Sequence, residues 1–299
     1  MEKKKLVIIM AVWKRHELTE LALNHLKKLQ KKKKFEVVIA GSEGEKSRNL
    51  VEPFGFEYIE TSNDFLTVKN NAMTLKAKEM NPDGVVILGS DDFVNENVID
   101  KYFELIEEGF DGVFGFGDLY FYDTKTQKMI HHDSGEKSFG AGRFYSRNAL
   151  DVCDFMPWTG KHKKGCDINS KKHLESLGIK FEKQKLYEFG GFLVDVKHNV
   201  NITSKAIMDM GEEVDSSFLS KNGIRIKTGL NKLSKMWEEG LQEEMVEKVE
   251  SNDHLVHVVL TEKGRNTHWP SEKLQGKTEF RVSESLAKSL IKEGLVVKK

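Results

Sequence analysis

The feature that most constrains the fold is an unbroken apolar run, Leu6 to Val12, followed closely by an amphipathic pattern. A run rich in β-branched residues, without polar alternation, is typical of a strand buried on both faces of a parallel sheet. After it, leucine and alanine recur at helical spacing, which predicts a helix over 17–30. Phe35 to Ala40 is a second short apolar run. A strand, a helix and a strand at this interval form a βαβ unit, so we predict an α/β fold with a mostly parallel sheet.

The alternation continues along the chain. We predict further strands at 56–59 and 85–88, a helix marked by Val68, Ala72 and Leu75, and a helix over 95–108. Beyond residue 110 the pattern predicts strands at 112–116, 119–122, 129–132 and 190–196, and a helix over 167–177. We place a domain boundary near 203: residues 1–203 form the α/β domain and 204–299 an accessory domain. The accessory domain reads as helical and polar to 250, then as a strand at 255–260, a helix over 284–293 and a final strand at 295–297.

Composition narrows the class of protein. Hydrophobic residues make up 38% of the 299 residues, which is enough to bury a core. The two cysteines, Cys153 and Cys166, argue against a disulfide-stapled secreted scaffold. The longest apolar run is far shorter than the roughly 20 residues that span a bilayer. We therefore expect a soluble, cytoplasmic protein without a membrane partner; the 47 basic and 47 acidic residues balance, so net charge selects no partner.

The stretch from Val85 to Phe93 carries the clearest chemical signal. A buried strand there is followed by Gly89, Ser90, Asp91 and Asp92. In an open α/β sheet, ligands bind beyond the carboxyl ends of the strands. Adjacent carboxylates at that edge suit Mg²⁺ or Mn²⁺, which prefer oxygen ligands. The alternative is structural, because Ser-Asp-Asp also suits the N-cap of the helix predicted over 95–108.

The order of these motifs resembles that of family-2-like GT-A glycosyltransferases, including phage-type members. In that family the first strand ends in a motif like Pro-Val-Tyr-Asn-Arg, and this chain reads Ala-Val-Trp-Lys-Arg over 11–15. An Ala-Arg-Asn-like segment precedes the metal strand, and here 69–72 reads Lys-Asn-Asn-Ala. The metal motif looks like Leu-Asp-Ser-Asp-Asp with its first aspartate replaced by Gly89. The resemblance covers about residues 5–200 and implies a GT-A, Rossmann-like fold.

Two later segments extend the resemblance. Residues 140–147 look like the segment that shapes the sugar and acceptor pocket, and Gly165-Cys166-Asp167 occupies the place of an acidic pair that begins a helix. By that match Asp167 is the general base, since Cys166 replaces the other acid. A simple helix cap at Asp167 is the alternative. His198 is similar to a histidine that helps hold metal or pyrophosphate in many members of the family.

The resemblance implies a metal-dependent glycosyltransferase that inverts the anomeric carbon of a nucleoside-diphosphate sugar, such as a UDP-sugar. Mn²⁺ or Mg²⁺ would be held by Asp91, Asp92 and His198. The donor would be bound by residues of the first two strand ends, of the third helix and of the metal motif: Val12, Trp13, Arg15, Glu43, Lys69, Asn70, Ser90 and Asp91. Trp13 serves equally well as core packing, and Glu43 is a shifted substitute for the family's base-binding acid.

Two other functions stay open. A nucleotidyltransferase shares such a sheet, but generally has a glycine-rich loop after the first strand, and residues 11–18 contain no glycine. A non-catalytic nucleic-acid-binding or assembly protein with a degenerate domain would explain Gly89 and Cys166.

The acceptor is open as well: a hydroxyl on a modified DNA base, a saccharide or a protein. The DNA alternative rests on the basic tail, 254–299, in which histidines, Trp269 and Phe280 are interleaved with lysines. A packing or dimerisation role for the tail is the plainer interpretation. The basic stretch 161–164, Lys-His-Lys-Lys, reads as a solvated loop close to an anionic acceptor.

Overall fold

The computed structural model describes residues 4–197, 205–231, 255–260, 279–283, 291 and 296–298. The chain divides into two compact units, 1–234 and 235–299. Residues 205–231 therefore belong to the first unit, where β12 (Glu212–Val214) pairs with β8 (Met129–Asp133). The division into compact units falls at 234, beyond the predicted boundary at 203. That the first part is catalytic and the rest accessory stays a prediction.

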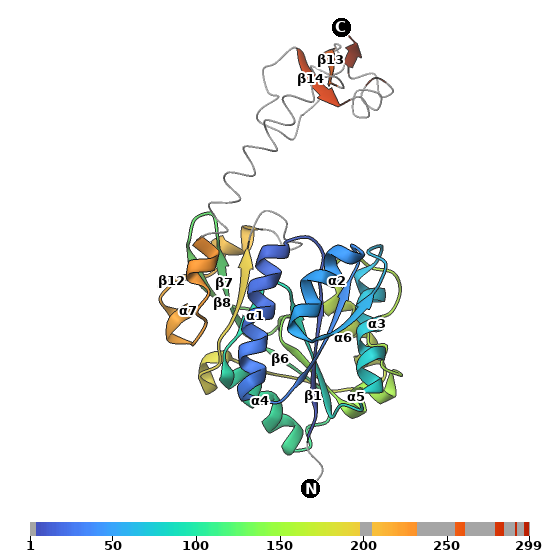
Figure 1. Ribbon diagram of the computed structural model, residues 1–299, viewed down its shortest axis with the longest axis vertical. Coiled ribbons are helices and arrows are strands. Elements are labelled where there is room, and N and C mark those ends of the chain that lie inside the picture. Colours follow the sequence, from blue (N-terminus) through green and yellow to red (C-terminus); the bar gives the residue numbers. More distant parts are fainter. Residues whose placement is uncertain are drawn as a thin grey trace. The chain divides into compact units, whose positions relative to one another are not determined.

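The main sheet of the first unit has seven strands and is mostly parallel (Figure 1). Its order is β10 (Phe181–Gln184), β6 (Val113–Phe116), β9 (Arg143–Ser146), β4 (Gly84–Gly89), β1 (Leu6–Ala11), β2 (Glu36–Gly41) and β3 (Glu57–Glu60). The strands run parallel except β9, which is antiparallel to β4 and to β6. The predicted α/β class is confirmed.

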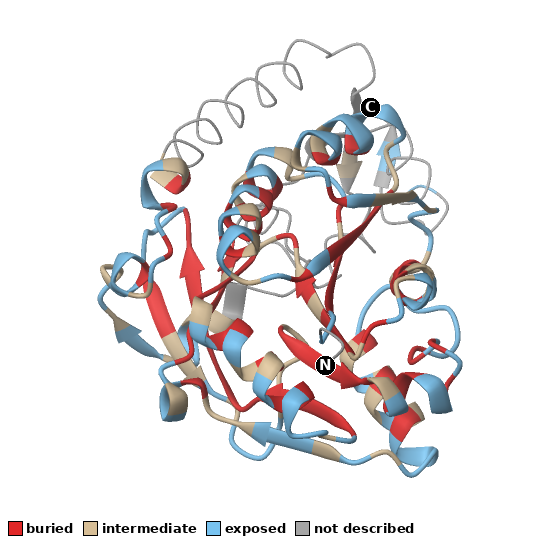
Figure 2. Cartoon of the chain, turned by 60° about the horizontal axis from the view of Figure 1, so that its bottom comes forward, coloured by how far each residue is buried: buried red, intermediate tan, exposed pale blue. Residues whose placement is uncertain are grey.

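The centre of the sheet is buried on both faces, as the apolar run predicts. Leu6 to Met10 are fully buried, and burial of each such side chain contributes about 1.5–3 kcal/mol. Val7 and Ile9 face a core formed with α3 (Leu66–Glu79), α5 (Arg147–Val152) and α6 (Cys166–Ser176). On the other face, α4 (Glu96–Glu107) stacks Tyr102 on Phe144. In Figure 2 the central strands are red and the helices are exposed on their outer sides.

Two helices of the first unit differ in their buried faces: one face is mainly apolar and the other is largely polar. Helix α1 (His16–Lys32) buries four of its five leucines, while Leu21 is half-buried. Helix α3 exposes Val68 and Leu75, at 46% and 41%, two of the residues from which it was predicted. Its buried face is largely polar instead and includes Thr67, Lys69, Asn70 and Thr74.

Hydrogen bonds explain this polar buried face. The Thr74 hydroxyl donates to the carbonyl of Phe155 at 2.6 Å, and the Thr67 hydroxyl donates to that of Gly160 at 2.9 Å. The Asn71 amide donates to the carbonyl of Trp158 at 2.7 Å. Polar groups taken from water in this way need such partners. The apolar spacing thus predicted the helix but not the face that it buries.

A second sheet completes the first unit. Its order is β12, β8, β7 (Asp118–Asp123), β11 (Leu193–Lys197) and β5 (Asp92–Val94). Strands β7 and β8 pair antiparallel, which confirms that 129–132 folds back on 119–122. The sequence did not predict β5, β9, β10, α2 (Glu45–Val51), α5 or the short 3-10 helices η1 (Glu52–Phe54) and η2 (Leu186–Phe189). The 3-10 helix η3 (Lys205–Asp209) and α7 (Phe218–Lys221) fall in the stretch predicted to be mostly helical from 204, which the unpredicted β12 interrupts.

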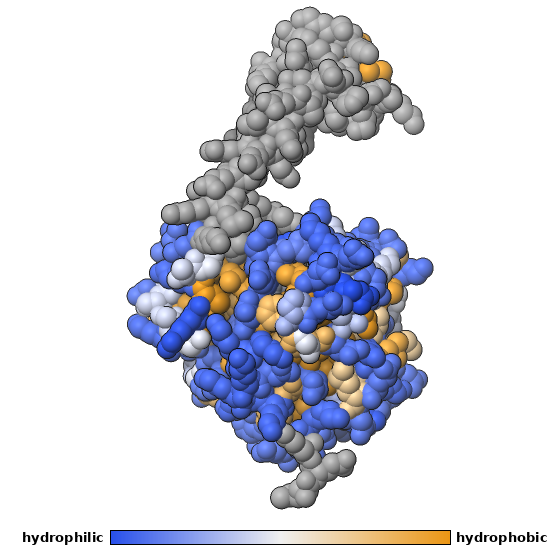
Figure 3. All heavy atoms as spheres, viewed as in Figure 1, coloured by the Kyte–Doolittle hydropathy of each residue, from blue (hydrophilic) through white to orange (hydrophobic). Residues whose placement is uncertain are grey.

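The second unit contains an antiparallel sheet with the order β14 (Glu279–Ser283), β13 (Leu255–Leu260) and β15 (Val296–Lys298). This confirms the strands predicted at 255–260 and 295–297, while β14 was not predicted. Of the stretch predicted to be mostly helical up to 250, residues 205–231 are described and contain η3, β12 and α7, while 232–250 lie outside the described residues, as does nearly all of the helix over 284–293. Within the described part of the chain, none of the helices is both long enough and apolar enough to span a bilayer. The face of the first unit shown in Figure 3 is largely hydrophilic.

Candidate active site

A cavity of about 410 Å³ opens where β1 and β4 end, at the edge predicted to bind ligands. Its wall is formed by the ends of both strands, the turn 89–92, the loop 139–141, β11 and the start of α6. Six of the predicted site residues line it: Arg15, Asn70, Ser90, Asp91, Asp92 and Asp167. Residues far apart in the sequence thus meet in one place.

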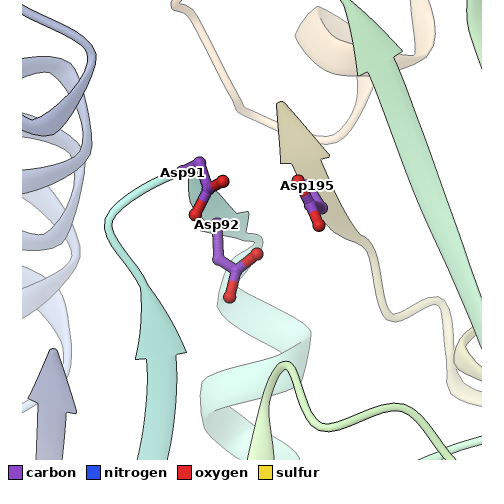
Figure 4. A group of neighbouring side chains, drawn as sticks. All are labelled: Asp91, Asp92 and Asp195. Carbon is purple, nitrogen blue, oxygen red and sulfur yellow. The ribbon is translucent and has the colours of Figure 1, made fainter. Parts of the chain in front are cut away.

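Three carboxylates gather in this cavity. Asp91 and Asp92 follow β4, and Asp195 projects toward them from β11 (Figure 4). One oxygen of each lies within 4.8 Å of the others. Strand pairing explains the meeting, because Asp195 stands directly opposite Asp92 in the antiparallel β11–β5 pair. The sequence analysis missed Asp195, although an acid inside the apolar strand Leu193–Val196 is itself a signal.

Crowding and burial perturb these acids. Burial, followed by the charges of Asp195 and Asp91, raises the pKa of Asp92 well above its usual value. Burial and the charge of Asp91 raise the pKa of Asp195 to about 6, although Lys197 opposes this. Two cations offset part of the charge: the Arg15 guanidinium lies 2.6 Å from an Asp91 oxygen, and the Lys197 ammonium lies 2.5 Å from an Asp195 oxygen.

The residues present fit a hard divalent cation. Within the described chain, the buried Oδ1 of Asp195 has no hydrogen-bond partner, and clustered carboxylate oxygens are the ligands that Mg²⁺ and Mn²⁺ take. A β-carbon at Gly89 would lie 2.7 Å from an Asp91 oxygen and 3.0 Å from an Asp92 oxygen. A side chain at position 89 would therefore displace the carboxylates of Asp91 and Asp92, and the third acid of this cluster comes from β11 instead. The predicted ligand His198 lies outside the described residues.

The structure does not use Ser90, Asp91 or Asp92 as a helix cap. Helix α4 is capped by Asn95, whose side chain accepts a hydrogen bond from the Val98 amide at 3.2 Å. Strand β5 lies between the carboxylates and that helix. The structural alternative for this motif is therefore wrong.

Arg15 reaches the carboxylates from an unusual backbone conformation. Its guanidinium also donates to the Ser90 hydroxyl at 2.8 Å. Both Lys14 and Arg15 are left-handed, with φ of 54° and 52°. Such positions cost of order 1–3 kcal/mol for residues with a β-carbon and cluster at functional sites. The left-handed backbone of the turn after β1 thus costs stability and places Arg15 against Asp91.

Asp167 stands in the first turn of α6 and lines the same cavity as the three carboxylates. The N-cap of that helix is Gly165, with φ of 68°, and no side chain caps it. The cap interpretation of Asp167 is therefore wrong. A β-carbon at Gly140 would lie 2.7 Å from the Asp167 β-carbon, so glycine lets the loop 139–141 approach this acid.

The remaining predicted donor residues lie beside the cavity rather than in its wall. Val12 is buried, and Trp13 is 38% exposed with the Lys14 ammonium 4.5 Å from its ring, so Trp13 is not core packing. A Glu43 oxygen accepts from the Lys14 amide at 2.7 Å and lies 2.9 Å from the His16 ring. Burial raises the pKa of Glu43, but these two contacts outweigh it and the pKa is lowered.

Lys69 and Asn70 are both buried on α3. The Lys69 ammonium donates to the Ser42 hydroxyl at 2.8 Å and to the Asn63 side chain at 3.1 Å. Burial lowers the pKa of Lys69 to about 8. The Oδ1 of Asn70 has no partner in the described part of the chain, and Asn70 lines the cavity. It is thus an acceptor left open on the cavity wall.

The His131-His132-Asp133 sequence does not form a metal cluster. His131 pairs with the buried Asp118 at 2.7 Å, and His132 lies 2.9 Å from the Met210 carbonyl oxygen. Within the described residues, the carboxylates at 91, 92 and 195 form the one group with metal-binding spacing. Cys153 and Cys166 are free and buried.

No protein-family model matches the chain, and no curated protein matches it. Solved structures do. The chain is similar to S. aureus TarS in complex with UDP-GlcNAc, at 15% identity and a TM-score of 0.49, over 67% of this chain and 60% of that chain. It is similar to the mannosyltransferase PcManGT from Pyrobaculum calidifontis in complex with GDP-Man and Mn²⁺, at 12% identity and 0.47, over 66% and 57%. It is also similar to a CMP:2-keto-3-deoxy-manno-octonic acid synthetase complexed with CTP, at 12% and 0.43, over 69% and 96%.

Glycosyltransferases are thus among the structures that the chain is similar to, as the motif resemblance predicts, and a synthetase complexed with CTP is another. The match spans about 60% of the length of the TarS chain. The phage-type assignment and the DNA acceptor find no support in these comparisons. The function is therefore derived from the side chains of the site.

Proposed function

We propose that this protein is a divalent-metal-dependent glycosyltransferase that moves a sugar from a nucleoside-diphosphate sugar to an acceptor hydroxyl, with inversion. The observation that carries the proposal is that a carboxylate cluster and a separate carboxylate line one cavity. Asp91, Asp92 and Asp195 would form a cation site at the strand ends, and Asp167, at the start of α6, lines the same cavity.

The carboxylates would hold Mg²⁺ or Mn²⁺. When bound, such an ion supplies Lewis-acid stabilisation of a diphosphate leaving group. Arg15 adds a fixed positive charge beside Asp91, since its guanidinium is anchored there and on Ser90. The open acceptor of Asn70 suits a donor hydroxyl. Lys69 and Glu43, beside the cavity, extend the donor site toward the end of β2.

Asp167 would move the proton. Its carboxylate accepts the proton of the acceptor hydroxyl while that oxygen forms a bond to the anomeric carbon. The bond from this carbon to the diphosphate breaks on the opposite side, and the diphosphate leaves with the electron pair. A single displacement of this kind inverts the carbon and needs no enzyme nucleophile.

A nucleotidyltransferase is the nearest rival. Such an enzyme needs a cradle for a nucleoside triphosphate, and residues 11–18, which lead from β1 into α1, contain no glycine. The turn is instead built on two left-handed residues with side chains, Lys14 and Arg15. This favours the glycosyltransferase.

The test supplies both kinds of substrate to the full chain with Mn²⁺. One arm contains UDP- and GDP-linked sugars and measures nucleoside diphosphate released. The other contains nucleoside triphosphates with sugar 1-phosphates and measures pyrophosphate. We expect nucleoside diphosphate release, lost with EDTA and in Asp91→Asn. Pyrophosphate release from the second arm alone would replace the proposal with the rival.

A further inference from the structure

Four basic residues in a row precede Gly165 and Asp167, and we call 161–164 the lysine loop; of these, Lys164 lines the cavity. Lys161, His162, Lys163 and Lys164 are all exposed. Within the described chain, none of the three ammonium groups forms an ion pair or a hydrogen bond. The Lys161 ammonium lies 5.7 Å from the Phe65 ring centre. The fold therefore presents these charges without compensating them.

The lysine loop is nevertheless held in place. The Thr67 hydroxyl donates to the Gly160 carbonyl at 2.9 Å and accepts from the His162 amide at 3.0 Å. Asn71 binds both backbone groups of Trp158, at 2.7 and 3.2 Å. This is what the polar buried face of α3 does: it fixes the segment that carries the lysines. A purely solvated charge run needs no such anchoring.

The lysine loop leads directly to the proposed base. Lys164 lines the cavity and is followed by Gly165, Cys166 and Asp167. Arg143, which is 2% exposed, lines the cavity too and donates to the Asp167 carbonyl at 2.7 Å. Its Nε has no partner in the described chain. Lys164 and Arg143 therefore bring positive charge to Asp167, the acid that would take the proton of the acceptor hydroxyl.

We propose that the acceptor is a phosphodiester polymer, whose phosphates are bound by the lysine loop while one of its hydroxyls reaches Asp167. Fixed, unpaired cations of like charge repel one another, and a polyanion relieves that repulsion while releasing its own counterions. Only Lys164 lies on the cavity wall, whereas Lys161 and Lys163 stand outside it. Such an arrangement fits repeated phosphates better than a single one. That the bound polymer is the sugar acceptor rests on the proposed function, but its binding by the lysine loop does not.

The test measures binding by the full chain, without donor, of two probes: a single-stranded oligothymidylate of about 15 nucleotides and inorganic polyphosphate. Titrations run between roughly 50 and 200 mM salt. The variant is Lys161→Gln/Lys163→Gln/Lys164→Gln. The matched control, Lys28→Gln/Lys31→Gln/Lys34→Gln, removes three exposed lysines around the C-terminal end of α1. Circular dichroism confirms that both variants fold.

We expect both probes to bind the wild type and the control, and to bind the loop variant more weakly. For the oligonucleotide, each phosphate contact contributes about 0.7 to the slope of log affinity against log salt, so the slope should fall by roughly two in the loop variant. Binding of the oligonucleotide alone, with the same loss, would identify the polymer as a nucleic acid.

An unchanged slope in the loop variant, or no binding of either probe to the wild type at the lowest salt, would overturn the proposal. Residual binding that is equal in the loop variant and the wild type would assign the polyanion to another surface. The two proposals fail separately. A chain that releases no nucleoside diphosphate but keeps loop-dependent binding loses the proposed function and keeps this site.

Discussion

Two groups of side chains at the cavity differ in how their charges are held. What we propose as the donor wall is formed by Arg15, Asp91, Asp92 and Asp195, with Lys197 paired to Asp195, and its charges are paired inside the fold: side-chain exposure is 12% for Arg15, 14% for Asp91 and 1% for Lys197. What we propose as the acceptor wall is formed by Asp167 and Lys164, and the rest of the lysine loop continues outside the cavity; the ammonium groups of the loop are exposed and unpaired. Buried charge pairs affect stability, since removal of one partner leaves the other charge buried and uncompensated. A wall whose charges are exposed can be altered at little cost to the fold.

The largest effect tests the chemistry of the acceptor wall. Asp167→Asn should lower turnover by about 10²–10⁴-fold, the usual contribution of a general base, and leave donor affinity unchanged. Stability should change little, because Gly165 rather than Asp167 caps α6. Steady-state kinetics and donor calorimetry check this. A drop of less than about tenfold would remove the proton-transfer role.

The next effect tests the donor wall. Asp91→Asn should weaken Mn²⁺-dependent donor binding by at least about 100-fold, since even groups behind a metal ligand contribute 10–100-fold. It should also destabilise the protein, because Arg15 loses its partner. Calorimetry with and without Mn²⁺, and urea unfolding, measure the two. Equal donor affinity in variant and wild type would contradict the assignment.

A smaller effect tests the spacing of the carboxylates. In Gly89→Ala the new β-carbon would lie 2.7 Å from an Asp91 oxygen, so that oxygen must move. We expect a loss of about tenfold in Mn²⁺ affinity, measured by electron paramagnetic resonance of free Mn²⁺. The control is Gly117→Ala, where the nearest atom would lie 3.6 Å away. Equal affinity in both variants would show that the spacing does not matter.

The pH dependence of the free energy of unfolding tests the buried charge of Lys69 without any measurement of activity. The pKa of Lys69 is lowered by burial from 10.5 to about 8. Between these values the unfolded chain binds a proton that the folded chain does not, so the free energy of unfolding rises with pH, by at most about 1.4 kcal/mol per unit. Lys69→Met removes this rise. The urea midpoint of Lys69→Met should therefore exceed that of the wild type by the largest margin below pH 8. A difference between the two midpoints that stays constant up to pH 10.5 would contradict this expectation.

The smallest effect should come from the lysine loop. Lys163→Gln should change the free energy of unfolding by no more than about 0.5 kcal/mol, as is usual for exposed substitutions. Thermal and urea unfolding check this. A larger loss would mean that the loop is structural, and the contrast between the walls would disappear.

The sequence predicted most strands and helices of the first unit because period and composition follow from burial. It also singled out Asp91 from its place after a buried strand and Asp167 from the family resemblance, and both line the cavity, while their roles stay predictions. Asp195 could not be placed, because its partner is set by the β11–β5 register. The polar buried face of α3 was hidden as well. Its two threonines, Thr67 and Thr74, and the neighbouring Asn71 bind backbone groups of 155–162, far away in the sequence, so apolar spacing could not indicate them.

Strand β11 lies between β7 and β5 in the second sheet, yet it is the last of the three in the chain. Until it is inserted, β5 lacks its partner, and Asp91 and Asp92 lack Asp195. Pairing over such long stretches of chain is slow, because loop closure must precede the contacts that reward it. We therefore expect the three carboxylates to come together late in folding. If they hold a divalent ion as proposed, its binding would report that the first unit has finished folding.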